Sequence, residues 1–191
     1  IIYRIYHMIY LEPYHFISNY NKEELNSLSK KINIIYRNYK DPVKVNTMIK
    51  IRNECKKSGR KIFLSNDIKM AEKLKLDGVY IPSFNKVLNL QFKKNNKFQI
   101  LGSAHNLSEI RIKEKQGVDI IFISPIFKVN KSSNFLGLNK FNILSKFTQK
   151  KVVALGGINE KNIKKLKLIN CNGYASITYL KNRKELNDLR K

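Results

Sequence analysis

The chain has 191 residues, of which 42% are hydrophobic, enough for one folded domain with a substantial core. This composition excludes an intrinsically disordered chain, and no apolar run is long enough to span a membrane. Lysine and arginine number 38 against 14 acidic residues, a formal net charge of +24. Because these cations are spread along the chain without an RNA-binding or zinc motif, nucleic acid is not an expected partner.

The N-terminal segment and the cysteines bear on compartment and domain organisation. Residues 1–14 are apolar and aromatic, yet they carry charges and lack a small-residue cleavage site, which predicts a packed extension rather than a signal peptide. Cys55 and Cys171 lie far apart in the sequence, which favours two reduced thiols of a cytoplasmic protein over a disulfide or a metal site. We therefore expect an N-terminal extension over 1–14 and a single domain over 15–191.

Short β-branched runs alternate with helical patterns along the rest of the chain. The predicted strands are His15–Asn19, Ile32–Tyr36, Lys61–Ser65, Gly78–Pro82, Gln99–Ala104, Asp119–Pro125, Lys151–Gly157 and Gly173–Thr178. The predicted helices are Lys22–Lys30, Val43–Ser58, Ile68–Leu76, Leu107–Gln116, Leu138–Phe147, Glu160–Leu168 and Lys181–Lys191, and Ser83–Phe98 is expected to be irregular. Alternation implies parallel pairing with right-handed crossovers. Eight strands in this length favour a compact α/β fold, a single (β/α)₈ TIM barrel with a short N-terminal extension.

The carboxyl ends of barrel strands carry the chemistry of this architecture. At the predicted ends the chain has many Ser, Asn, Lys and Arg residues and few carboxylates, and it lacks a Ser-His-Asp grouping or a His/Cys cage. Such a rim suits anionic ligands better than proton transfer. Gly156 and Gly157 end one strand, and Ile177 and Thr178 end the next. Glycine backbone at neighbouring strand ends predicts a phosphate site there.

The order of several motifs resembles the thiamine-phosphate synthase and thiazole tautomerase superfamily. The motifs are Asp-Gly-Val-Tyr-Ile (77–81), Gly-Ser-Ala-His (102–105), Ser-Pro-Ile-Phe (124–127), Leu-Gly-Leu (136–138) and Ala-Leu-Gly-Gly-Ile (154–158). Ile-Tyr-Arg-Asn-Tyr (35–39), with the Ser-Pro-Ile-Phe segment and Gly-Tyr-Ala-Ser-Ile (173–177), resembles a divergent branch of this family found in alphaproteobacteria. The resemblance implies a transferase of thiamine biosynthesis, of the thiamine-phosphate diphosphorylase type. Such an enzyme joins a hydroxymethylpyrimidine diphosphate to a thiazole phosphate and releases pyrophosphate.

The resemblance also implies roles for individual residues. Arg37, Ser103 and Lys131 match the catalytic positions. The implied substrate-binding residues are Tyr36, Asn38, Tyr39, Ser65, Asn130, Gly156, Gly157, Ile177 and Thr178. Tyr39 stands where the family has a lysine. The implied partners are small phosphorylated substrates, with no membrane, and the chain is compatible with a homo-oligomer.

The family's two aspartates for Mg²⁺ are changed in this chain. Asn66 and Asn85 fall at these two positions, and Asp67 substitutes if the loop slips by one residue. Two amides in place of two carboxylates remove two negative charges from a site for a hard dication. The resemblance nevertheless implies Asn66, Asp67 and Asn85 as the ligands of an Mg²⁺ cofactor.

Two alternatives to synthase activity stay open on the sequence. One is a thiazole tautomerase, but Pro125 stands where the tautomerases have a catalytic histidine, which counts against it. The other is a non-catalytic protein that binds phosphate or thiamine precursors, which the asparagines at the metal positions favour.

Overall fold

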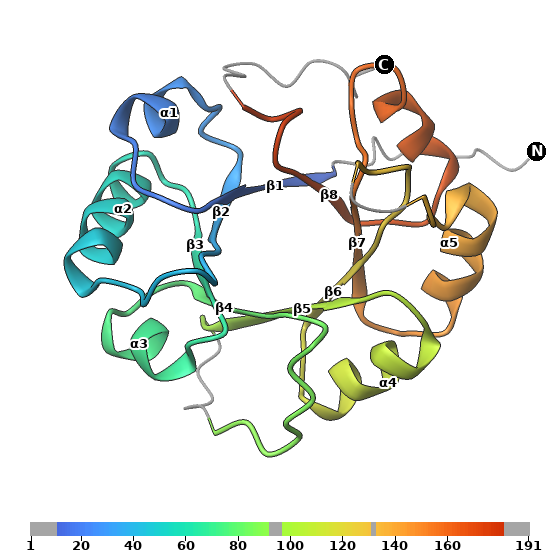
Figure 1. Cartoon of the computed structure of the whole chain (residues 1–191), viewed down its shortest axis with the longest axis horizontal. Coiled ribbons are helices and arrows are strands. Elements are labelled where there is room, and N and C mark those ends of the chain that lie inside the picture. The colour runs from blue at the N-terminus through green and yellow to red at the C-terminus, as the bar shows by residue number, and fades with distance from the viewer. Residues whose placement is uncertain (1–10, 92–96, 131–132, 182–191) are drawn as a thin grey trace, which may run out of the picture.

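The computed structural model describes residues 11–91, 97–130 and 133–181. Eight parallel strands close into one barrel in chain order, with the first strand pairing with the last (Figure 1). The strands are β1 (Glu12–Ile17), β2 (Asn33–Tyr36), β3 (Ile62–Ser65), β4 (Gly78–Ile81), β5 (Gln99–Ala104), β6 (Ile120–Ile123), β7 (Lys151–Leu155) and β8 (Gly173–Ser176). The prediction of a single (β/α)₈ barrel is confirmed.

Helices form the outer ring of the barrel (Figure 1). They are α1 (Lys22–Ser27), α2 (Val45–Lys57), α3 (Ile68–Lys73), α4 (Leu107–Lys115), α5 (Gly137–Lys146) and the 3₁₀ helix η1 (Ile163–Leu168). Asn106 caps α4 by accepting from the Glu109 N–H at 2.9 Å. As expected, the described part of the segment between β4 and β5 contains neither helix nor strand. No described helix has the length and apolarity needed to cross a bilayer.

The two faces of the strands build two separate apolar clusters, as the two-residue period of a strand requires. The inner cluster fills the barrel with Tyr14, Phe16, Ile35, Phe63, Tyr80, Leu101, Ile120, Phe122, Val153 and Ala175. The outer cluster lies between strands and helices and includes Ile34, Leu64 and Val79. Side chains two positions beyond the inner cluster therefore reach the carboxyl-end rim of the barrel.

The structure corrects two expectations about strand bounds, and a third expectation concerns residues outside the described part of the chain. β1 begins at Glu12, so residues 12–14 belong to the barrel and not to the extension, and the strand ends at Ile17 rather than Asn19. The residues after β7 and β8 that were expected to extend those strands are loop residues. The expected helix Lys181–Lys191 falls almost wholly outside the described residues, as does most of the extension.

Candidate functional site

The rim above the inner cluster carries one arginine and several hydroxyls. Arg37 follows Ile35 by two residues, and Ser65, Ser103 and Ser124 follow Phe63, Leu101 and Phe122 in the same way. All three serines are buried, whereas Arg37 is half-buried. In this series of inward positions no described residue carries a carboxylate. The rim is therefore a hydrogen-bonding surface with a positive charge.

Arg37 is held over an aromatic floor. Its guanidinium carbon lies 4.5 Å from the centre of the Phe16 ring, and its backbone N–H donates to the Ile17 carbonyl at 2.8 Å. Below it, Phe16 and Phe122 each make an edge contact with Tyr80, at 5.3 and 5.5 Å between ring centres. A guanidinium stacked on a ring keeps its donors directed outward, toward an anion above the rim.

Tyr80 and Ser103 connect this floor to the rim. Burial raises the pKa of the Tyr80 phenol to about 12, while the hydrogen bond with Ser103 and the charge of Arg37 oppose the rise. The phenol is therefore neutral at physiological pH and serves as a hydrogen-bonding group beneath the site. Ser103, predicted to be catalytic, thus lies between Tyr80 and the open rim.

The loop after β2 contacts the carboxyl end of β3 through Tyr39. The Tyr39 phenol lies 2.9 Å from the Ser65 hydroxyl, and its ring meets Phe84 edge-on at 5.4 Å. Asn38 turns this loop, since its side-chain oxygen accepts from the backbone N–H groups of Lys40 and Asp41. Tyr36 is buried in the outer cluster, between strands and helices, and only borders the depression near Asn38. The structure thus brings Tyr39 and Ser65 to the rim and holds Tyr36 behind it.

The three predicted metal ligands lie on the loops after β3 and β4, and several of their polar atoms are already engaged. Asn85 Nδ2 donates to Asn66 Oδ1 at 2.7 Å, and Asn85 Oδ1 accepts from the Val87 N–H at 3.0 Å. Asp67 Oδ1 caps α3 by accepting from the Met70 N–H at 2.9 Å. Among the described residues no group of three or more His, Cys, Asp or Glu side chains could hold a metal ion. One partly used carboxylate and two paired amides do not fit a resident Mg²⁺.

The glycine pair after β7 has a geometry that no other residue type adopts easily. Gly156 and Gly157 have φ values of +97° and +70°. A Cβ on Gly157 would lie 2.5 Å from the carbonyl oxygens of both Phe127 and Lys128. The loop after β6 therefore packs directly on Gly157, so close backbone approach by itself requires glycine there.

The same region offers backbone donors to a ligand. Within the described residues, the N–H groups of Gly157, Ile177 and Thr178 donate to no protein acceptor. A depression beside them is lined by Ile158, Asn159, Glu160, Lys161, Thr178, Tyr179 and Lys181. Ile177 and Thr178 are exposed at the rim. Free N–H groups at two adjacent strand ends can hold a phosphate.

Asn130 is exposed on the neighbouring loop, and Lys131 lies outside the described residues.

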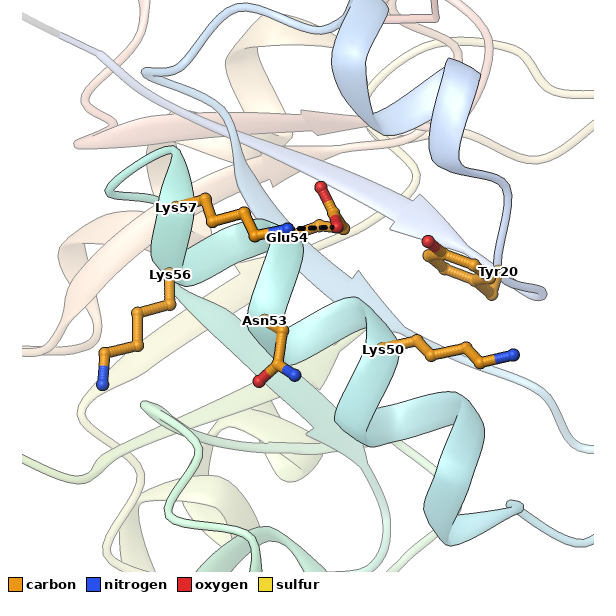
Figure 2. A pocket seen from close by; sticks show the side chains of 6 residues that line it. All are labelled: Tyr20, Lys50, Asn53, Glu54, Lys56 and Lys57. Carbon is orange, nitrogen blue, oxygen red and sulfur yellow. Dashed lines mark hydrogen bonds and ion pairs between the residues drawn. The ribbon is translucent and has the colours of Figure 1, made fainter.

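A further depression lies between Tyr20 and the helix α2 (Figure 2). Tyr20 and α2 line it, with Lys50, Asn53, Glu54, Lys56 and Lys57 from the helix. Lys57 Nζ donates to Glu54 Oε1 at 3.0 Å, and Lys50 Nζ lies 6.0 Å from the centre of the Tyr20 ring. None of the predicted site residues lines it, so the strand ends remain the candidate site.

Sequence reasoning missed one buried cation next to the site. Lys113 of α4 is fully buried and donates to the segment after β4 that carries Asn85. The signal was present in the sequence, because Lys113 stands three residues after Ile110, on the buried face of an amphipathic helix.

Comparison with known proteins places the chain in a family. Residues 23–180 match the sequence profile described as thiamine monophosphate synthase. A thiamine-phosphate synthase of Methanococcus vannielii is 29% identical over 119 residues, which cover 61% of this chain and 57% of that protein. One from Clostridium tetani is 26% identical over 163 residues, covering 84% of this chain and 69% of that protein.

A solved structure supports the same architecture. Thiamine phosphate pyrophosphorylase from Pyrococcus furiosus superposes with a TM-score of 0.72 at 19% sequence identity, covering 90% of this chain and 87% of that one. The chain spans less than two thirds of some relatives, 57% of the Methanococcus vannielii protein and 62% of a Lactococcus lactis one. Since the profile match extends over most of its length, the chain belongs to the thiamine monophosphate synthase family.

Proposed function

We propose that this protein joins a hydroxymethylpyrimidine diphosphate to a thiazole phosphate. The observation that carries the proposal is the rim itself, where Arg37 lies among buried hydroxyls with no carboxylate at the described inward positions. Family membership supplies the substrate class, and the free N–H groups after β7 and β8 offer a second anion site. Two anion sites on one rim suit a reaction between two phosphorylated molecules.

The reaction needs positioning and charge stabilisation rather than a base. The C–O bond to the diphosphate breaks with its electron pair leaving on pyrophosphate, and the thiazole nitrogen donates its lone pair to the carbon that remains. Arg37 stabilises the departing diphosphate by charge-assisted hydrogen bonds. Ser65 and Ser103 provide hydroxyl donors beside it, and the aromatic floor of Phe16 and Tyr80 excludes water from the cationic carbon.

The second substrate is held on the opposite side of the mouth. We propose that the backbone N–H groups of Gly157, Ile177 and Thr178 bind the thiazole phosphate, with Gly156 allowing the turn. Tyr39 and Asn38 border the diphosphate side, and Asn130 lies on the loop after β6. Lys131 keeps the role that the family resemblance implies for it. Holding both reactants in one orientation makes their union effectively unimolecular.

Mg²⁺ has a limited place in this proposal. Since Asn66, Asp67 and Asn85 do not fit a resident ion, we propose that any Mg²⁺ arrives as the counter-ion of the diphosphate substrate. The second oxygen of Asp67, whose Oδ1 caps α3, is a carboxylate atom that could approach it.

The direct test is an end-point assay with both substrates. The purified protein is mixed with the pyrimidine diphosphate and the thiazole phosphate, and thiamine phosphate is quantified by fluorescence after oxidation to thiochrome. Product formation supports the proposal. Saturable binding of the thiazole phosphate without product supports the alternative of a precursor-binding protein, which the neutral Asn66–Asn85 pair favours. Isomerisation of a thiazole phosphate without the second substrate indicates a tautomerase instead.

A further inference from the structure

A buried ammonium group holds the segment between β4 and β5. The Lys113 side chain is 0% exposed, and its Nζ donates at 2.8 Å to three oxygens: the Pro82 carbonyl, the Asn85 carbonyl and Gln116 Oε1. A lysine ammonium has three N–H donors, so its hydrogen-bonding capacity is fully used. None of these partners is a carboxylate, which is uncommon for a fully buried lysine.

Gln116 completes the same arrangement one turn later. It is 2% exposed, and its Nε2 donates to the Asn85 carbonyl at 3.0 Å and to the Val87 carbonyl at 2.8 Å. Lys113 and Gln116 together therefore bind three carbonyl groups of the segment after β4. This segment has no described helix of its own, so these hydrogen bonds replace the packing that a helix would provide.

The residues held in this way contact the loops after β2 and β3. The Asn85 backbone is fixed by both side chains, while its amide reaches Asn66 at the end of β3. Phe84, next to it, meets the Tyr39 ring beside Ser65. Lys113 itself lies beneath the segment and reaches neither the rim nor a substrate.

We propose that Lys113, with Gln116, is a positioning residue for the diphosphate side of the active site. It fixes the backbone at Pro82, Asn85 and Val87, so that Asn85 and Phe84 meet the loops after β2 and β3. The expected effect on the KM of the diphosphate substrate rests on the proposed synthase function, whereas the expected effect on the backbone of the segment does not.

Hydrogen exchange directly tests whether Lys113 and Gln116 fix the backbone of the segment after β4. Backbone amides of 83–91 are followed by mass spectrometry in the wild type, Lys113→Met, Lys113→Arg and the control Lys115→Met, whose side chain is exposed on the same helix. We expect exchange in this segment to rise about tenfold or more in Lys113→Met while β1 and β8 stay protected. Lys113→Arg should restore part of the protection. A folded Lys113→Met protein with unchanged exchange, or with exchange raised evenly through the barrel, would overturn the proposal.

A second variant keeps the test decisive if Lys113→Met does not fold. Gln116→Leu removes two hydrogen bonds to the segment and one of the three acceptors of Lys113 Nζ, while the two bonds from Nζ to the Pro82 and Asn85 carbonyls can remain, and it should raise exchange at 85–88 specifically. Unchanged exchange there contradicts the proposal as well.

Kinetics then separate positioning from general stability. In Lys113→Met, we expect the KM for the pyrimidine diphosphate to rise about tenfold while the KM for the thiazole phosphate, bound across the mouth, stays the same. Equal increases in both would count against a local role. If the wild type makes no thiamine phosphate, the synthase proposal fails, and the exchange measurement still decides the role of Lys113.

Discussion

The side-chain amide of Asn85 donates to the side-chain oxygen of Asn66 across 2.7 Å, joining the loops after β3 and β4. Two carboxylates at these positions would repel each other and need a cation between them. The neutral pair holds the loops together without an ion. The loops at the diphosphate side therefore keep their arrangement without a bound metal ion.

The first prediction follows from this neutral pair. Addition or chelation of Mg²⁺ should leave the thermal midpoint of the substrate-free wild type unchanged, because no described carboxylate cluster binds the ion. Asn85→Asp places a second carboxylate near Asp67, and Mg²⁺ at about 100 times its Kd should then stabilise the variant by about 2.7 kcal/mol. Thermal unfolding with and without Mg²⁺ measures both. A midpoint shift in the wild type would contradict the account.

Tyr39 gives a prediction about charge at the rim. Tyr39→Lys introduces an ammonium beside Arg37 and should raise the affinity for inorganic pyrophosphate about tenfold through an added charge-assisted contact. Tyr39→Phe is the matched control, because it removes the hydrogen bond to Ser65 without adding charge. Calorimetric titration measures both affinities. Equal affinities in the two variants would show that Tyr39 is not on the anion's side of the rim.

Gly157 and Gly59 form a matched pair for a stability prediction. Their φ values are +70° and +69°, but a Cβ on Gly59 would meet nothing within 4 Å, whereas one on Gly157 would press on two carbonyl oxygens. Gly59→Ala should therefore cost about 1 kcal/mol for the backbone conformation alone. Gly157→Ala should cost about 3 kcal/mol or more, since the loop after β6 must also move. Urea unfolding of both variants measures this difference, and similar costs would refute the close approach.

His15 gives a prediction on pH and stability. Its Nδ1 donates to the Ser176 carbonyl at 3.0 Å, and its Nε2 lies 3.5 Å from Glu24 Oε1. Burial lowers the pKa of His15 below its ordinary 6.5, although Ser176 and Glu24 oppose the shift. Below pH 6.5 the unfolded chain thus binds the proton more readily, so the free energy of unfolding falls as pH decreases and is fully recovered above pH 6.5.

The matching variants isolate this contribution. His15→Asn should lose less stability than the wild type between about pH 7.5 and 5.5 in urea unfolding. His105→Asn, with a half-exposed ring paired to Glu109, serves as the control for acid effects elsewhere. A wild-type slope retained in His15→Asn would contradict the role of burial.

The barrel could be predicted from the sequence because short β-branched runs alternate with helical patterns, and a side-chain cap marks the start of α1, α3 and α4. The start of β1 could not, since the apolar and aromatic residues 1–14 indicated a packed extension, whereas Tyr14 in fact faces the barrel interior. Part of the site could not be predicted from the sequence either. Gly157 was predicted as a phosphate donor, but its contact with Phe127 and Lys128 depends on how two loops pack. Lys113 was missed because composition assigns lysine to the surface, and only its three acceptors explain its burial.

Replacement of Arg37 is the decisive test of whether this rim stabilises the departing diphosphate. We would measure kcat/KM for thiamine phosphate formation in the wild type, in Arg37→Met and in Lys40→Met, an exposed neighbouring cation. The account predicts a loss of about 100-fold or more in Arg37→Met, near 2.7 kcal/mol of transition-state stabilisation, with Lys40→Met close to the wild type. Equal rates in Arg37→Met and the wild type would show that the diphosphate is not stabilised at this rim.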